Sequence, residues 1–204
     1  MANDIVNYQD VITDIKGIIS SGREVAYNEA NKAMVLTYWH VGKRIVEQEQ
    51  AGKERAKYGQ ALIEVLADEL TKEYGKSFSK RNLQYFRKFY LAFPDEKIVN
   101  ACVHNLNWTH FRALLRVSDE NARMWYMNEA AQEGWSSRTL DRNISTQYYY
   151  RLMQSPRKDD VMNEMLQKTA ENQRDKFELL KSPIVAEFLN HRFNSFGLKK
   201  SAAL

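Results

Sequence analysis

The stretch KSFSKRNLQYFRKFYLAF, residues 76–93, contains five cations and no acid. The cations are Lys76, Lys80, Arg81, Arg87 and Lys88. The whole chain has 30 Lys and Arg against 26 Asp and Glu, a net charge of +4, so these five cations exceed the positive surplus of the entire protein. The surplus is therefore concentrated in one segment the length of a short helix.

This segment has the period of an amphipathic helix. Its apolar side chains recur at helical spacing: Leu83, Phe86, Tyr90 and Phe93. The opposite face carries Lys80, Gln84, Arg87 and Lys88, with Leu91 as the one apolar intruder. Ser79 is placed to cap the first turn with its hydroxyl, and Pro94 prevents further winding. The pattern predicts a helix over residues 80–92.

A second helix is predicted just before it, over residues 60–73, with Leu62, Leu66 and Leu70 at helical spacing. Gly75 can supply the left-handed residue that ends it. Two helices joined by a short glycine-containing turn have the outline of a helix-turn-helix, whose second helix lies in the DNA major groove. The alternative is a packing hairpin with a solvated charged face, and the sequence leaves both interpretations open.

Composition indicates a globular, all-α protein. Of 204 residues, 44% are hydrophobic and 12% aromatic, which is enough to build a core. The chain has only 8 Gly and 3 Pro, and most of them fall between periodic segments. We expect a helical bundle that contains one helix-turn-helix-like unit, or two.

The N-terminal region is predicted to form two helices. The first covers residues 4–19, and Ser20-Ser21-Gly22 is expected to break it. One face of this first helix holds Ile5, Tyr8, Ile12, Ile15 and Ile19. The second covers residues 23–50. Gly42 lies inside this second helix, where glycine costs about 1 kcal/mol relative to alanine, so we expect a close helix crossing there.

The middle of the chain offers several helix starts. IVNACV, residues 98–103, fits either a short strand or a helical turn. Asn107 is expected to cap a helix over residues 108–117, and Ser118 the following one, which ends at Gly134. Ser136 is expected to cap a helix that continues to Leu152.

A faint internal echo links two of these segments. Gly75 and Ser79 lead to Leu83 much as Gly134 and Ser136 lead to Leu140. In the second copy Arg138 and Arg142 share one face, together with Tyr149. The echo fits either a second helix-turn-helix-like unit with a lesser DNA-binding patch, or capping chemistry that both segments have in common.

The composition changes past Pro156. Residues 156–204 are predicted to form a polar linker helix and a short apolar helix that starts at Pro183, so the domain organisation is 1–155 followed by this appendage. The apolar stripe of residues 159–189 is too thin for a core of its own. It therefore needs the main body, a homo-oligomer or another protein to pack against.

No catalytic constellation is visible in the sequence. Phosphate-binding loops, zinc motifs and nucleophile motifs are absent, and the histidines (His40, His104, His110 and His191) have no metal-binding spacing. We therefore predict no cofactor, no metal and no enzyme activity. A single cysteine, Cys102, and an N-terminus without a signal sequence or an apolar span predict a cytoplasmic protein that does not enter a membrane.

Three stretches together closely resemble the N-terminal domain of the YhcG-like family. They are YWHVGKRIVEQEQAGKERAKYGQALIEVLADEL (residues 38–70), FSKRNLQYFRKFYLAFP (78–94) and LNWTHFRALLRVSDENARMWYMNEAAQEGWSSRTLDRNI (106–144). LKSPIVAEFL, residues 180–189, is similar to the joint between that domain and the next. In full-length relatives the next domain is a predicted PD-(D/E)XK nuclease, whose acidic motif this chain lacks.

The resemblance implies a helical targeting module without established catalytic residues. Combined with the basic helix, it predicts a module that binds double-stranded DNA for a nuclease. The residues expected to bind DNA are Lys76, Lys80, Arg81, Gln84, Arg87, Lys88, Arg138 and Arg142. The alternative is a protein-interaction or oligomerisation module that holds a nuclease domain or partner.

Overall fold

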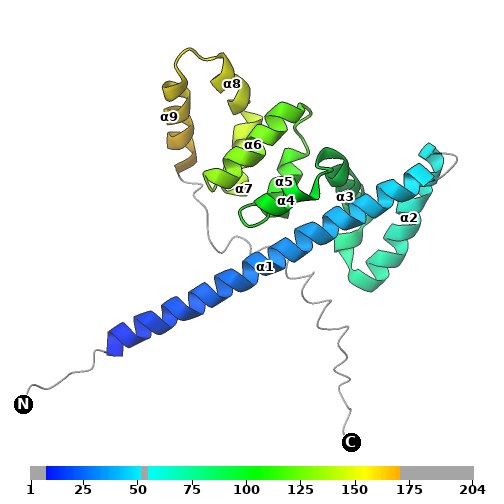
Figure 1. Ribbon diagram of the computed structural model, residues 1–204, viewed down its shortest axis with the longest axis horizontal. Coiled ribbons are helices and arrows are strands. Elements are labelled where there is room, and N and C mark those ends of the chain that lie inside the picture. The colour runs from blue at the N-terminus through cyan, green and yellow to red at the C-terminus, as the bar shows by residue number, and fades with distance from the viewer. Residues whose placement is uncertain (1–7, 52–54, 171–204) are drawn as a thin grey trace, which may run out of the picture.

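The computed structural model describes residues 8–51 and 55–170, which form helices and no strand (Figure 1). In chain order the elements are α1 (Tyr8–Ala51), α2 (Arg55–Tyr74), the 3₁₀ turn η1 (Lys76–Phe78), α3 (Lys80–Ala92), α4 (Glu96–Cys102), α5 (Trp108–Leu114), α6 (Glu120–Gln132), α7 (Ser137–Ser145), α8 (Tyr148–Gln154) and α9 (Lys158–Thr169). The all-α prediction is confirmed.

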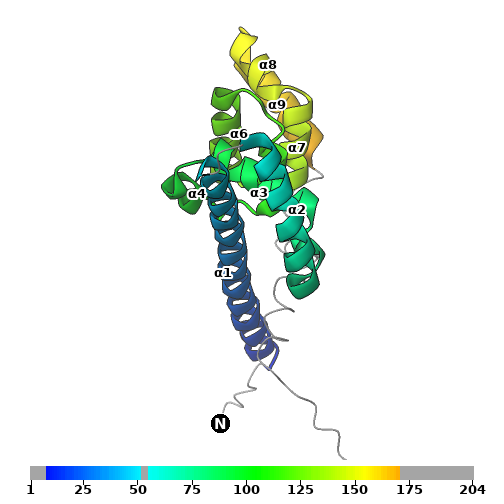
Figure 2. The same ribbon diagram turned by 90° about the vertical axis from the view of Figure 1, so that its right-hand side faces the viewer.

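The predicted break at Ser20-Ser21-Gly22 is wrong, because α1 is one helix of 44 residues. Serine and glycine each weaken a helix by about 1 kcal/mol or less, and without a proline the backbone hydrogen bonds continue through all three residues. The C-terminal half of α1 lies against the body, whereas the N-terminal half projects away from it (Figures 1 and 2).

The predicted close crossing at Gly42 is confirmed. An added Cβ at Gly42 would lie 2.0 Å from the carbonyl oxygen of Phe86 in α3. One turn earlier on α1, the Tyr38 ring stacks on Phe86 at 4.1 Å between centroids. Two more contacts join α1 to the body: Trp39 Nε1 donates to Phe93 O at 2.7 Å, and Asn31 Nδ2 donates to Val103 O at 2.9 Å. The core is therefore built around the α1–α3 crossing.

The turn between α2 and α3 has the expected glycine but not the expected cap. Gly75 adopts φ 83°, in the left-handed region. Ser79 precedes α3, yet its side chain makes no capping hydrogen bond, so that detail of the prediction is wrong. Instead the Asn82 amide donates to the carbonyls of Lys76 and Ser77 and closes the turn. Helix-turn-helix function for this unit remains a prediction.

The second half of the body is a series of short helices. IVNACV lies within α4, so the helical alternative for this segment is correct. Asn107 caps α5 as predicted, and His110 completes a capping box. The cap of α6 is Asp119 rather than Ser118, because the Asp119 carboxylate accepts from Asn121 N and Ala122 N.

The predicted helix from Ser136 to Leu152 is divided into α7 and α8. Ser136 caps α7 as expected, accepting from Thr139 N at 3.0 Å. Gln147 then takes a left-handed conformation, φ 53°, and α8 starts in a new direction. The Tyr126 hydroxyl stabilises this corner, since it donates to Asn143 O and accepts from Tyr149 N.

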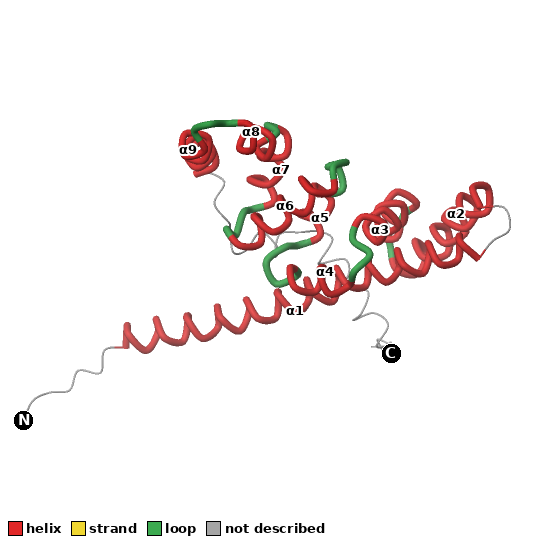
Figure 3. Tube along the Cα trace, turned by 45° about the horizontal axis from the view of Figure 1, so that its top comes forward, coloured by secondary structure: helices red, strands yellow, loops and turns green. Residues whose placement is uncertain are grey.

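The predicted linker helix starts as α9, which packs back on the body (Figure 3). Val161 and Met165 lie against the main core, and Glu164 pairs with Arg151 of α8. The predicted terminal helix from Pro183 and the Lys199-Lys200 tail lie outside the described residues.

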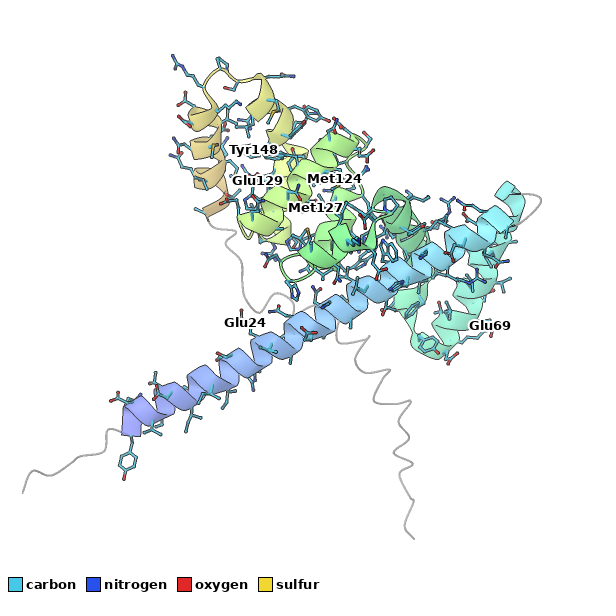
Figure 4. All side chains as sticks on the ribbon, in the orientation of Figure 1. Glu24, Glu69, Met124, Met127, Glu129 and Tyr148 are labelled. Carbon is cyan, nitrogen blue, oxygen red and sulfur yellow. The ribbon has the colours of Figure 1, made fainter. Side chains whose placement is uncertain are left out.

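Three tryptophans are buried: Trp39, Trp108 and Trp135. Trp125 of α6 is half-buried, between the ring of Trp135, just before α7, and the ring of Tyr148 in α8. In this part of the molecule Glu129 lies close to Tyr148 (Figure 4), and burial raises the pKa of the Glu129 carboxyl above its ordinary value. None of the described helices is long and apolar enough to cross a membrane.

Candidate nucleic-acid interface

The basic face of α3 is partly neutralised by neighbouring helices. Arg87 Nε donates to both carboxylate oxygens of Glu49 in α1, at 2.7 and 2.9 Å, and Glu49 is only 12% exposed. Lys80 Nζ pairs with Glu64 of α2 at 2.6 Å. These two cations therefore help to hold α3 in place. Gln84 and Lys88 are exposed on α3, and Lys76 is exposed on η1.

Arg81 lies instead in an open groove of about 620 Å³, which we call the arginine groove. The groove lies between α3, α5 and α7. Its charged residues are Arg81, Arg112, Arg116, Arg138, Asp141 and Arg142, and Tyr85, Thr109, Ala113 and Ser137 complete its lining. The fold thus brings Arg81 from the first predicted patch together with Arg138 and Arg142 from the second, although they are far apart in the sequence.

The α5–α7 side of the groove is fixed by His110, which is buried. Its Nδ1 accepts from the Asn107 amide at 3.2 Å as part of the α5 capping box, and its Nε2 lies 2.9 Å from Trp135 O. The same Nδ1 also lies 2.7 Å from Asn107 Oδ1, so polar groups hold the ring at both of its nitrogens. Because Trp135 immediately precedes the Ser136 cap of α7, this histidine ties the start of α5 to the start of α7.

Tyr85 lies between two guanidinium groups of the groove. Arg112 stands 4.9 Å from the ring centroid and Arg81 stands 5.9 Å from it, both within the range of cation–π contacts. Hydrogen bonding by Arg81, then by Arg112, lowers the pKa of the Tyr85 phenol from its ordinary value. Tyr85 therefore holds one arginine from α3 and one from α5 beside the same ring.

Acidic compensation in the groove is small. Arg116 pairs with Asp141, and both side chains are about half exposed. Among the described residues the remaining four arginines of the groove form no ion pair with an acid. Four uncompensated guanidiniums in one concave surface suit a ligand with several negative charges, since each guanidinium can bind a phosphate oxygen pair with parallel N–H groups.

Sequence reasoning did not identify Arg112, Arg116 and Tyr85. Tyr85 was assigned to neither face of its helix. Arg112 and Arg116 are four residues apart, the same spacing as Arg138 and Arg142, and would share a face if the helix continued. That repeated spacing was a usable signal, but the sequence does not show that both pairs face Arg81.

Other reactive side chains do not gather into a site. Cys102 is buried, and burial raises the pKa of its thiol. In residues 8–51 and 55–170 no group of three His, Cys, Asp or Glu side chains is arranged to hold a metal ion.

The chain matches a known protein family and a named relative. The family model described as the DUF1016 N-terminal domain matches residues 14–151, which span α1 to α8. The chain belongs to this family. It is also 32% identical, over 211 aligned residues, to an Escherichia coli (strain K12) protein named "Putative nuclease YhcG". The alignment covers 89% of the chain and 56% of that relative, so the chain spans little more than half the relative's length. No solved structure matches.

Proposed function

We propose that this DUF1016 N-terminal domain binds double-stranded DNA through the arginine groove and so directs a nuclease to its substrate. The observation that carries the proposal is the convergence of Arg81, Arg112, Arg138 and Arg142, from three helices, without an acidic partner. Arg81 and Arg138 both lie in the first turn of their helices, where the positive end of the helix dipole adds to the attraction for phosphate.

The nuclease part of the proposal rests on the relative. That relative is named a putative nuclease, and the remaining 44% of its length lies outside the alignment. The family model that matches this chain is described as an N-terminal domain. A targeting role for it is consistent with a basic surface that lacks catalytic carboxylates: Asp141 is the only acid in the groove, and it pairs with Arg116.

The test is DNA binding measured as a function of salt concentration. Each neutralised phosphate contributes a slope of about −0.9 to log affinity against log salt, so three or four contacts predict a slope of about −3 to −4 for a duplex. The variant Arg81→Gln/Arg138→Gln/Arg142→Gln should lose most of this salt dependence, because all three side chains are exposed in the groove. Glutamine keeps the helix propensity and removes the charge.

A matched control removes the same charge elsewhere. Lys72→Gln/Lys88→Gln/Lys97→Gln changes three exposed cations outside the groove and should retain a slope close to wild type. An unchanged slope in the groove variant, or an equal loss in both variants, would contradict the proposal. An equal loss of slope in both variants would indicate that DNA binds the outer face of α3 or the positive surface charge in general.

The second candidate function is a protein-interaction module that holds a nuclease partner. Two exposed apolar surfaces favour it: the projecting half of α1 and the outer side of α9, where Met162 and Leu166 are exposed. Salt-insensitive or absent DNA binding by the wild-type chain, together with capture of a purified nuclease domain of the same family, would select this candidate.

A further inference from the structure

The projecting half of α1 carries a row of exposed apolar side chains, which we call the α1 stripe. The stripe consists of Tyr8 (75% exposed), Val11 (48%), Ile12 (44%), Ile15 (50%), Ile18 (71%), Ile19 (50%) and Val25 (63%). Single exposed apolar side chains are normal on a protein surface, but seven of them along one helical segment form a continuous apolar patch.

The α1 stripe points away from the body. Successive residues turn by about 100°, which places the stripe on the opposite side of the helix from the face that α1 buries, the face of Met34, Tyr38 and Gly42. The stripe is therefore not an extension of the face that packs on α3. Side chains in the projecting half, up to Glu24, stand clear of the other helices in Figure 4.

The spacing of the stripe is that of a coiled coil. The a and d positions of successive heptads hold Tyr8, Val11, Ile15, Ile18, Gly22 and Val25, and Ile12 and Ile19 flank them at e. The segment is also a poor solitary helix, because it is rich in β-branched residues and contains Gly17 and Gly22. A partner helix would supply the stabilisation that intrinsic propensity does not.

The charges beside the stripe indicate what the partner is. Lys16 and Arg23 lie on one flank, and Asp10 and Asp14 lie on the other. In a parallel pair related by a two-fold axis, the basic flank of each copy faces the acidic flank of its partner. At about 100 Å² per side chain, seven side chains on each of two copies supply roughly 1,400 Å², within the range of specific interfaces.

We propose that the α1 stripe is a self-association surface, which a second copy of this chain covers to form a parallel coiled-coil dimer. The full chain should sediment with a mass approaching twice 23.9 kDa as its concentration rises. Ile15→Gln/Ile18→Gln should sediment as a monomer with the body still folded, as judged by an unchanged cooperative unfolding transition. Gly17→Ala, on the opposite side of α1, should self-associate at least as well as wild type.

Cysteine cross-linking tests the orientation. In the parallel pair Ile15 faces Ile15 of the second copy, so Ile15→Cys should form an intermolecular disulfide on oxidation. Thr13→Cys, on the far face, and the wild type, whose Cys102 is buried, should not form this disulfide.

A wild-type chain that stays monomeric overturns the proposal. Slow amide exchange of residues 8–26 in that monomer would mean that the chain's own C-terminal segment covers the stripe. A dimer unaffected by the glutamine variant, or one without the Ile15→Cys cross-link, overturns it too.

Discussion

Gly42 is the residue on which the packing of the body depends most directly. The Cβ of alanine would lie 2.0 Å from Phe86 O and 2.6 Å from Phe86 C, both backbone atoms that cannot move without shifting α3. Since α1 and α3 are also joined by the Tyr38–Phe86 stack and the Arg87–Glu49 pair, such a shift would disturb the centre of the core.

We expect Gly42→Ala to lower the free energy of unfolding by about 3 kcal/mol or more, as in severe overpacking. Gly17→Ala is the matched substitution in the same helix, where an added Cβ meets nothing within 4 Å. It should raise stability by up to about 1 kcal/mol through helix propensity. Urea unfolding of both variants measures the difference, and an unchanged free energy of unfolding in Gly42→Ala would mean that α1 and α3 do not approach so closely.

Asp119 provides a pH-dependent contribution to stability. The Tyr150 hydroxyl donates to Asp119 Oδ2 at 2.9 Å, and this bond, with those from the α6 backbone, lowers the pKa of the carboxyl. A lowered folded-state pKa means that the stabilisation is fully present above the ordinary aspartate pKa of about 3.9, and is lost as pH falls through the folded-state value.

Asp119→Asn should therefore have a lower melting temperature than wild type at neutral pH, and the gap should narrow as pH falls below about 4. Ser118→Ala is the control, because Ser118 does not cap the helix and its replacement should change little at any pH. A gap that is constant with pH would show that the Asp119 charge contributes nothing to the folded state.

At the residue scale, the sequence predicted single positions well where local chemistry determines them. Gly42, Gly75, Asn107 and Ser136 act as expected, since each effect depends on a few neighbouring backbone atoms. The prediction for Ser118 was wrong because the Asp119 carboxylate, one residue later, accepts from the first backbone N–H groups of α6. The prediction for Ser79 was wrong because its side chain makes no capping hydrogen bond, and the Asn82 amide stabilises the preceding turn by donating to its carbonyls.

Among the elements, α5 and α7 have the closest relation to the arginine groove. His110 joins them through Asn107 and Trp135 O, so both helices keep their spacing only while this buried ring stays in place. His110→Ala should cost about 2–4 kcal/mol, through a cavity and unsatisfied buried polar groups. The exposed His104→Ala should cost less than about 0.5 kcal/mol.

Thermal and urea unfolding would measure both histidine variants. DNA affinity should fall in His110→Ala even at temperatures where the protein is fully folded, because Arg112 and Arg138 would no longer be held opposite one another. Wild-type affinity in a folded His110→Ala protein would show that the groove does not depend on this link.

The helices themselves were mostly predictable, and their boundaries were less so. Apolar periodicity identified α2 and α3, and capping residues indicated α5 and α6. The continuity of α1 was missed because the prediction treated three weak helix formers as a stop. The division of α7 from α8 was missed because Gln147 takes a left-handed conformation without being glycine or asparagine, and tertiary contacts of Tyr126 stabilise it.

For the whole molecule, the arrangement of charge could not have been predicted from the sequence. Lys80 and Arg87 belong to the most basic stretch of the chain, yet they pair with Glu64 and Glu49. Arg112 belongs to a stretch without obvious charge, yet it faces Arg81 across Tyr85. The packing of α3 against α1, α2, α5 and α7 decides which cations are neutralised and which meet in a groove.

The two proposed surfaces lie on separate parts of the molecule, so their effects should be separable. The arginine groove lies between α3, α5 and α7, and the α1 stripe lies on the end of a helix whose 44 residues extend about 66 Å. Loss of the stripe should leave each groove intact. A dimer, however, presents two grooves to one DNA molecule, and the second binding event then becomes intramolecular.

Ile15→Gln/Ile18→Gln should accordingly bind a duplex of one helical turn with wild-type affinity, because only one groove can engage so short a ligand. On a duplex of many turns the same variant should bind at least tenfold more weakly than wild type, since avidity is lost. Anisotropy titrations at one salt concentration measure the affinity of wild type and variant for each duplex.

If the variant binds the short duplex as much more weakly as it binds the long one, the α1 stripe contacts DNA or supports the groove. Equal affinity on the long duplex would mean that the two grooves of a dimer do not reach the same DNA.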